Sequence, residues 1–312
     1  MIQYFNIVEH RTVATDKPGS GTWVNILPPP KQEEFSELSD ALDVSIDFLK
    51  DSLDIDERSR YETDNDVKLI VFKTPTENNS FNESDAFYTT IPICILLTKE
   101  QIVTVNSFEN EAIKKFLNSF QNRHPDKQNM IVLKIFEKIT NNYLDHLKEI
   151  NQRPNAQEQK LYAANRNEEL YQLMRIQKSL VYFVTALPRK ELLHIKLARS
   201  DFLQLRADEK DFLDDLVIET SQALETANTY TTILISTLDT FASIISNNQN
   251  VVLKRLTSIT LFLSIPVLIA SIYGINVPLP FQQSPYAFWV PISISLIILA
   301  IVAFKFIKRK NK

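Results

Sequence analysis

The stretch "LTSITLFLSIPVLIASIYGINVPLP", residues 256–280, decides the architecture of this chain of 312 residues. It belongs to a run of 49 residues, 256–304, that carries no charged side chain. Two apolar segments of 18 residues stand out in this run, residues 256–273 and 287–304. Each is close to the ~20 residues that a helix needs to cross a bilayer. Because only 13 residues join them, the sequence predicts a membrane hairpin of two helices.

Charge is distributed unevenly along the chain. None of the 38 acidic residues follows residue 250, so the first 250 residues form an acidic body, which argues against nucleic acid as a partner. Seven basic residues flank the hairpin away from its loop, and the loop has none. The positive-inside rule therefore predicts a protein of the cell membrane with both termini cytoplasmic. The basic residues are Lys254, Arg255, Lys305, Lys308, Arg309, Lys310 and Lys312.

The first 120 residues combine β-branched apolar runs with turn-rich pieces and short helical patterns. Examples of the runs are "IQYFNIV" at 2–8, "VKLIVFKT" at 67–74 and "FYTTIPICILLT" at 87–98. This composition predicts a mixed α/β domain. The only cysteine, Cys94, lies in the last run; a single thiol forms no internal disulfide, and we expect a buried hydrophobic side chain.

A long helix is predicted to lead into the first apolar segment. Apolar residues take helical spacing from about residue 111 onward, and no proline or glycine occurs between Pro188 and Pro266. After a short polar break near residues 197–202, one helix of roughly 66 residues can run to residue 273, about 100 Å at 1.5 Å per residue. A helix of this length is typical of a stalk that joins a soluble domain to a membrane.

Polar side chains recur along one face of the first apolar segment and of the helix before it. Two interpretations fit this stripe: small hydroxyl residues mediate close helix packing, or the stripe faces water in a pore. Two spans cannot enclose a channel, so a pore requires several copies of the chain. Asn250, Thr257, Ser264 and Ser271 recur at steps of seven, with Thr260 between them, and Asp239, Ser243 and Ser246 continue the stripe toward the N-terminus at steps of three and four.

Neither apolar segment contains Asp, Glu or His. Proton-coupled and ion-coupled carriers usually need an ionisable group at membrane depth, whereas a passive channel for a hydrated cation does not. Rings of hydroxyl and amide oxygens can hold a cation with its water shell in place. This suits Mg²⁺, which dehydrates reluctantly.

Gly274, one of three glycines in the chain, directly follows the first apolar segment. It has two interpretations. It can end the helix, a position that favours glycine. It can also let the backbone turn, so that backbone carbonyls and the Asn276 amide face a pore axis. Non-helical backbone at this depth is tolerated only where protein or a water-filled cavity satisfies its polar groups.

The C-terminal arrangement resembles the CorA family of divalent-cation transporters. The resemblance rests on "YGIN" at residues 273–276 beside the family's Tyr-Gly-Met-Asn signature, two C-terminal spans, a long preceding helix and a basic tail. The segment "DERSRYETDNDVKLIVF", residues 56–72, is also similar to the family's cytosolic domain. The resemblance implies a homopentamer, with the first span lining a pore and Tyr273, Gly274, Ile275 and Asn276 forming the selectivity filter.

The resemblance also assigns roles along the long helix. It implies a polar ring at Asn250, a hydrophobic constriction at Leu253 and Leu256, and regulatory Mg²⁺ binding in the cytosolic domain at Asp215, with Asp211 and Asp214 as further candidates. Mg²⁺ would thus be both transported and regulatory. The implied pore-lining residues are Asn250, Leu253, Leu256, Thr257, Thr260, Ser264 and Ser271.

The fold class expected from pattern and resemblance together is an α+β cytosolic funnel domain with a long stalk helix, followed by a C-terminal two-helix transmembrane hairpin. The first span is expected to line the pore, and the loop to lie outside the cell. The expected segments are the α/β domain at 1–120, a helical region at 121–207, the stalk at 208–255, the first span at 256–275, the loop at 276–286, the second span at 287–307 and a basic cytosolic tail at 308–312.

Three functions fit this architecture. Passive Mg²⁺ influx, with Co²⁺ or Ni²⁺ as incidental passengers, ranks first. A zinc transporter is the alternative, because Gly-Ile-Asn also occurs in the ZntB-like branch; however, the stripe lacks the His and Cys ligands that Zn²⁺ prefers. A membrane-anchored sensor or scaffold is the third. An enzyme is not expected, since there is no glycine-rich phosphate loop and the four histidines are scattered.

Overall fold

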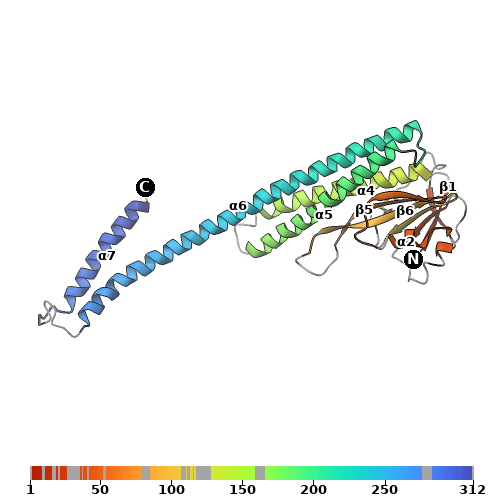
Figure 1. Ribbon diagram of the computed structural model, residues 1–312. Coiled ribbons are helices and arrows are strands. Elements are labelled where there is room, and N and C mark those ends of the chain that lie inside the picture. Colours follow the sequence, from red (N-terminus) through yellow and green to blue (C-terminus); the bar gives the residue numbers. More distant parts are fainter. Residues whose placement is uncertain are drawn as a thin grey trace. The chain divides into compact units, whose positions relative to one another are not determined.

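A computed structural model (Figure 1) shows seven strands and five helices among the residues that it describes. The chain divides into two compact units, residues 1–238 and 239–312. The described residues are 2–8, 11–15, 19, 22–26, 36, 38–40, 42–51, 54–78, 85–106, 110, 113–114, 116, 128–158, 166–275 and 283–310.

The first unit contains one sheet in the order β2-β1-β3-β7-β6-β5-β4. Neighbouring strands are antiparallel except β3 and β7, which are parallel because the chain crosses over between them. The longest pairing joins β5 to β6, with Cys94 opposite Val71. The strands are β1 (Ile2–Val8), β2 (Arg11–Thr15), β3 (Trp23–Ile26), β4 (Arg60–Asp64), β5 (Val67–Glu77), β6 (Tyr88–Leu97) and β7 (Ile102–Asn106).

Both faces of the central strands are covered, which explains their nearly continuous apolar sequences. One face packs against α2 (Ile46–Asp51) through Phe48 and Leu49, and Cys94 lies in this core. Cys94 is buried, as the sequence predicted. Burial raises the pKa of its thiol, so this cysteine is unreactive.

The opposite face packs against α4 (Gln128–Glu158) and α5 (Arg166–Arg199). Figure 1 shows these two helices between the sheet and the first part of α6. Phe72 of β5 meets Phe136 of α4 edge to face, with 5.0 Å between ring centroids. The Tyr143 hydroxyl donates to the Lys73 carbonyl at 3.1 Å, so α4 is tied to the sheet by both apolar and polar contacts.

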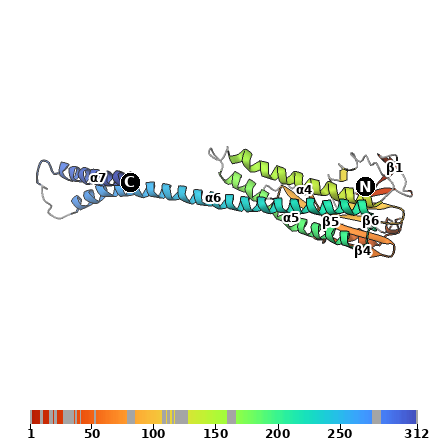
Figure 2. The same ribbon diagram turned by 90° about the horizontal axis from the view of Figure 1, so that it is seen from above.

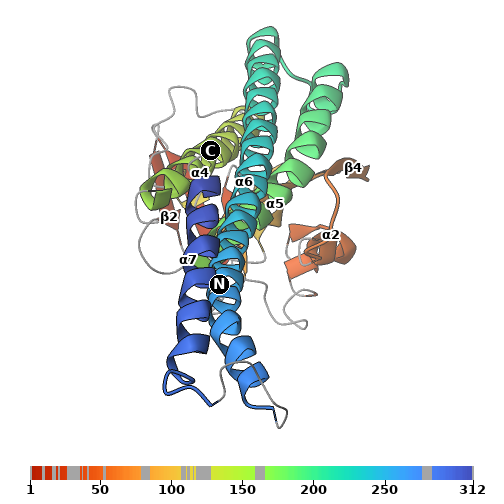
Figure 3. The same cartoon turned by 90° about the vertical axis from the view of Figure 1, so that its left-hand side faces the viewer.

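Helix α6 (Ala207–Tyr273) has the length that the sequence predicted and begins after the predicted polar break. Its start is capped by Glu209, whose carboxylate accepts a hydrogen bond from the Arg206 backbone N–H at 2.9 Å. In the first unit α6 lies along α4 and α5 (Figures 2 and 3). Its buried residues recur at steps of three and four, with a final step of seven: Glu209, Leu213, Leu216, Thr220, Ala223, Ala227 and Leu234.

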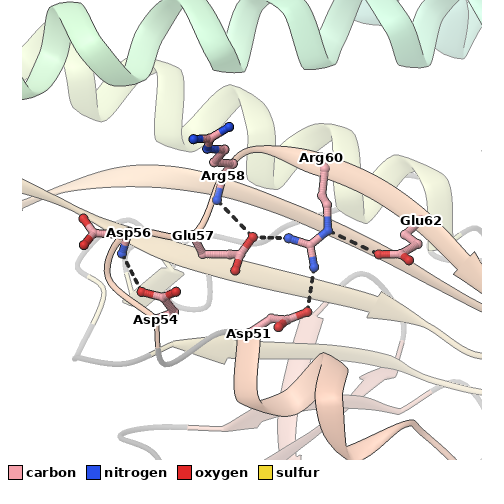
Figure 4. A network of polar contacts seen from close by, with 7 residues as sticks. All are labelled: Asp51, Asp54, Asp56, Glu57, Arg58, Arg60 and Glu62. Carbon is pink, nitrogen blue, oxygen red and sulfur yellow. Dashed lines mark hydrogen bonds and ion pairs between the residues drawn. The ribbon is translucent and has the colours of Figure 1, made fainter.

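A charged network fixes α2 to the edge strand β4 (Figure 4). The Arg60 guanidinium donates to Asp51 of α2 at 2.6 Å, to Glu62 at 3.2 Å, and to Glu57 in the turn before β4. Burial raises the pKa of Asp51, and the nearby Arg60 opposes this effect. The segment that resembles the CorA cytosolic domain thus serves to join helix and sheet.

Replacing Arg60 should therefore destabilise the first unit. Because Arg60→Ala leaves two partly buried carboxylates without their partner, we expect a loss of about 1–2 kcal/mol in the free energy of unfolding. Thermal unfolding of the full-length protein, followed by intrinsic fluorescence, measures this loss. Arg58→Ala is the control, since the Arg58 side chain is exposed and should change stability by less than about 0.5 kcal/mol. Equal losses in both variants would contradict the role given to the network.

The second unit contains the C-terminal part of α6 and the whole of α7 (Trp289–Lys310). Helix α7 runs back in the opposite direction to α6 (Figures 1 and 3). Both helices are apolar over the predicted spans. Because α6 ends at Tyr273 and α7 begins at Trp289, the predicted hairpin is present.

Candidate ion-conducting site

Helix α6 contains a segment that is long and apolar enough to cross a membrane, and none of that segment is buried within the chain. The apolar part of α7, Trp289–Phe304, is slightly shorter. Large apolar side chains of both helices are exposed; Leu263 and Phe304, for instance, are 65% and 69% exposed. Such a surface requires lipid or another protein copy around it.

The end of α6 lies at the predicted filter segment. The Gly274 N–H donates to the Ala270 carbonyl at 3.0 Å and to the Ser271 carbonyl at 3.2 Å, and the Ile275 N–H donates to Ile272 at 3.4 Å. A Cβ at Gly274 would meet the Ala270 carbonyl oxygen at 3.4 Å, an ordinary contact, and the backbone there is not left-handed. The chain's own conformation therefore does not require glycine at this position. Asn276 lies outside the described residues.

The residues of the predicted stripe are all exposed along α6. Four hydroxyl groups in the span donate to carbonyls of the preceding helical turn. These hydrogen bonds occupy the hydroxyl protons and leave the oxygen lone pairs facing outward. The stripe thus presents acceptors to its surroundings. The pairs are Thr257 to Leu253 at 2.8 Å, Thr260 to Leu256 at 2.9 Å, Ser264 to Leu261 at 2.9 Å and Ser271 to Val267 at 2.8 Å.

A strict seven-residue polar repeat shares Ser243, Asn250, Thr257, Ser264 and Ser271 with the stripe and begins much earlier in α6 than Asp239, the first residue of the predicted stripe. Every seventh residue of α6 from Asp208 to Ser271 is polar and exposed. These residues lie beside, and not within, the face that packs on α4 and α5. A strict count in sevens over the whole helix would have found this repeat in the sequence. Its members are Asp208, Asp215, Gln222, Thr229, Ser236, Ser243, Asn250, Thr257, Ser264 and Ser271.

Two leucines interrupt the polar character just before the span. Leu253 and Leu256 are 57% and 58% exposed. Leu253 follows Asn250 by three residues and Leu256 precedes Thr257, so both lie at or beside the stripe. Lys254 and Arg255 lie between them, also exposed.

The candidate regulatory acids Asp211, Asp214 and Asp215 are exposed in the first turns of α6. The structure gives none of them an ion pair with another described residue. Among the described residues no group of three His, Cys, Asp or Glu side chains is placed to hold a metal ion. Asp215 raises the pKa of Glu219, after the larger effects of burial and of Glu137, so three carboxylates from α4 and α6 share one neighbourhood.

The sequence profile of the CorA-like Mg²⁺ transporter protein family matches residues 19–309 of this chain. The chain belongs to the CorA family. It is 27% identical over 290 residues to the cobalt/magnesium transport protein CorA of Methanocaldococcus jannaschii, covering 91% of this chain and 89% of that protein. It is 22% identical over 299 residues to the protein of the same name from Thermotoga maritima, covering 93% and 83%.

Solved structures share the fold of this chain. The complete structure of the CorA magnesium transporter from M. jannaschii matches with a TM-score of 0.83 at 24% identity, covering 98% of this chain and 97% of that one. The cytoplasmic domain of ZntB from Vibrio parahaemolyticus matches with a TM-score of 0.57 at 14% identity, covering 80% and 97%. The α+β domain, long helix and shorter C-terminal helix expected from the sequence are confirmed, and CorA proteins are membrane ion transporters.

Proposed function

We propose that this CorA protein is a homopentameric channel for passive influx of hydrated Mg²⁺, with Co²⁺ and Ni²⁺ as incidental passengers. The α6 helices of the five copies surround the pore, and α7 faces lipid. Family membership supports Mg²⁺ as the ion. The observation within the chain that carries the proposal is the polar stripe of α6.

The stripe is suited to an ion that keeps its water. Water molecules around a cation turn their oxygens inward and their hydrogens outward, so the hydrated ion is a hydrogen-bond donor. Hydroxyl groups whose protons are bonded to the helix can only accept. Neutral oxygens hold Mg²⁺ weakly enough to release it, and Mg²⁺ does not need to lose its inner waters.

The seven-residue period supports assembly of α6 around a common axis. A straight α-helix drifts by ~20° per seven residues, so a strict repeat stays on one side only when helices supercoil around one another. In this chain the repeated residues are polar, and the shared axis would therefore hold water. Leu253 and Leu256 would form a ring at the cytosolic end that closes the pore by excluding water.

The filter is assigned to Tyr273, Gly274, Ile275 and Asn276. Five Asn276 amides would form a ring of neutral oxygens at the outer mouth. Within one chain there is room for a side chain at Gly274, so the conformation of that chain does not explain the glycine. The absence of a side chain would instead let the backbones of neighbouring copies approach one another at that ring. Backbone carbonyls at Ile275 would complete the ring.

Orientation and driving force follow from the basic residues at the ends of the hairpin. With both termini in the cytoplasm, spans at 256–275 and 287–307 would place the loop outside. An inside-negative potential of 100 mV favours entry of a divalent cation by about 4.6 kcal/mol. Passive influx then needs no coupled ion.

Regulation is assigned to Asp211, Asp214 and Asp215. Because no metal-binding group forms among the described residues of one chain, a cation bound there would take further oxygens from a neighbouring copy. Mg²⁺ would link cytosolic domains and hold the pore closed.

Mg²⁺ should therefore protect the full-length protein from protease. We expect cleavage to slow as Mg²⁺ rises, and Asp215→Asn should require more Mg²⁺ for the same protection. Asp201→Asn is the control, since Asp201 is exposed in the turn before α6. If Asp215→Asn and wild type show the same Mg²⁺ dependence, Asp215 has no sensing role.

Transport itself is tested in liposomes that contain a Mg²⁺-sensitive dye. An inside-negative potassium diffusion potential should drive Mg²⁺ entry at a rate that rises with the potential. Absence of entry with correctly inserted pentamers would overturn the proposed function. Zn²⁺ entry without Mg²⁺ entry would favour the zinc alternative.

A further inference from the structure

Lys190 is a fully buried lysine in α5, at the place where α4, α5 and α6 meet. Its side-chain nitrogen lies over α4: it contacts the Thr140 hydroxyl, the Phe136 carbonyl oxygen at 3.3 Å and the Tyr143 ring at 5.8 Å from the centroid. Lysine is almost never fully buried unless it is paired. Lys190 belongs to none of the features described above: the sheet, the hairpin and the stripe of α6.

The hydrogen-bond partners of Lys190 match a neutral amine. A charged ammonium has three N–H donors, and a neutral amine has two. Within the part of the chain that the structure describes, the Lys190 nitrogen meets two acceptors, and no carboxylate forms an ion pair with it. A third N–H would face only the Tyr143 ring.

The acceptor Thr140 connects Lys190 to α6. The Thr140 hydroxyl lies 3.4 Å from the Thr220 hydroxyl, which in turn lies 3.4 Å from Nδ1 of His194, one turn beyond Lys190 in α5. Thr220 is a central residue of the α6 face that packs on α4 and α5. Both hydroxyl protons are donated within their own helices, from Thr140 to the Phe136 carbonyl at 2.9 Å and from Thr220 to the Leu216 carbonyl at 2.7 Å, so the two threonines meet by packing. A change at Lys190 therefore acts on a residue that packs directly against the buried face of α6.

The charges around Lys190 come from all three helices. Glu219 of α6 favours its charged form, whereas burial opposes that form more strongly and lowers the pKa of Lys190 to about 7. His194 is also buried, and both burial and Lys190 lower its pKa. Glu137 and Lys134 of α4 and Asp215 of α6 act on Glu219 from further out. One oxygen of Glu219 is buried and has no hydrogen-bond partner among the described residues.

We propose that protonation of Lys190 loosens the packing of α6 on α4 and α5, so that cytosolic pH controls how firmly the long helix is held. The neutral amine satisfies its donors in the closed packing. The ammonium gains a third partner only when the helices separate enough to admit water or to bring the Glu219 carboxylate within reach. The proposal does not depend on which ion crosses the membrane.

The sign follows from linkage. An exposed lysine has a pKa near 10.4, so the opened state binds the proton more tightly than the closed state, and opening becomes more frequent as pH falls. With a closed-state pKa of about 7, the population of the opened state should rise about tenfold from pH 9 to pH 8 and about fivefold from pH 8 to pH 7. It should level off below about pH 6.

Hydrogen exchange of the full-length protein in lipid nanodiscs measures this opening. Exchange of residues 209–234, corrected for the intrinsic effect of pH, should follow these factors between pH 7 and pH 9. This range avoids the titration of His194, whose lowered pKa lies on the acid side. Lys190→Met should remove the pH dependence. Lys196→Met, the same change at an exposed lysine of α5, should retain it.

Glu219→Gln gives a second test that leaves Lys190 in place. Because Glu219 favours the charged lysine, its removal should lower the pKa of Lys190, and the rise from pH 8 to pH 7 should approach tenfold. Exchange in wild type that does not vary with pH in this range would overturn the proposal. The same pH dependence in wild type and Lys190→Met would also overturn it.

Discussion

Asn276→Ala should reduce Mg²⁺ entry into liposomes to about the level of protein-free liposomes. The change removes one amide from each copy, so a ring of five carbonyl oxygens disappears from the outer mouth of the proposed pore. A hydrated cation would then meet apolar methyl groups at its point of entry, where the proposed ring of amide oxygens had stood. Dye fluorescence under a fixed inside-negative potential measures the effect.

Gln283→Ala is the matched control for this variant. It removes an amide from the same loop, and Gln283 is exposed and lies seven residues beyond Asn276. We expect Gln283→Ala to transport Mg²⁺ at nearly the wild-type rate, with equal amounts of pentamer in both preparations. Equal flux through Asn276→Ala and wild type would remove the filter assignment.

Ser264→Leu should block transport at mid-membrane. Ser264 presents a hydroxyl acceptor on the stripe of α6, and five leucines at this level would make the axis apolar and narrow. Water leaves such a constriction, and a divalent cation without its water has no comparable ligands there. We expect Mg²⁺ flux to fall to background while the pentamer and the cytosolic fold persist.

Ser258→Leu is the comparison for this second variant. Ser258 also donates its hydroxyl proton to the preceding turn, at 2.7 Å from the Lys254 carbonyl oxygen, but it lies off the stripe. The two variants therefore change the same chemical group in the same helix on different faces. Substantial flux through Ser264→Leu, or an equal loss in both variants, would contradict a pore lined by the stripe.

The sequence predicted the parts of the fold where pattern and environment agree. The β1 strand was predicted with its observed bounds because it is an apolar, β-branched run, and α6 with nearly its observed length because no proline or glycine occurs between Pro188 and Pro266. The strands β2 and β4 were missed. The β4 sequence, "RYETD", is charged and mostly exposed because it forms a sheet edge, so it lacks the apolar signal of a buried strand.

The site was predicted less completely, for two physical reasons. Gly274 was expected to serve the turn after the helix, but its backbone there is not left-handed, and the conformation of its own chain does not require glycine. Lys190 was not singled out in the sequence. It lies in the spacing of the buried face of α5, together with Leu187, His194 and Leu197, and that spacing was the available signal.

The central proposal is that identical copies of α6 turn their polar stripe toward a shared water-filled axis. Cysteine accessibility in lipid tests it most directly, in a Cys94→Ala background that removes the one native thiol. Ser264→Cys lies on the stripe, and Ile259→Cys lies on another face of the same helix. A charged, membrane-impermeant thiol reagent should modify Ser264→Cys rapidly and leave Ile259→Cys intact. Modification of Ile259→Cys but not of Ser264→Cys, or of neither, would contradict the account.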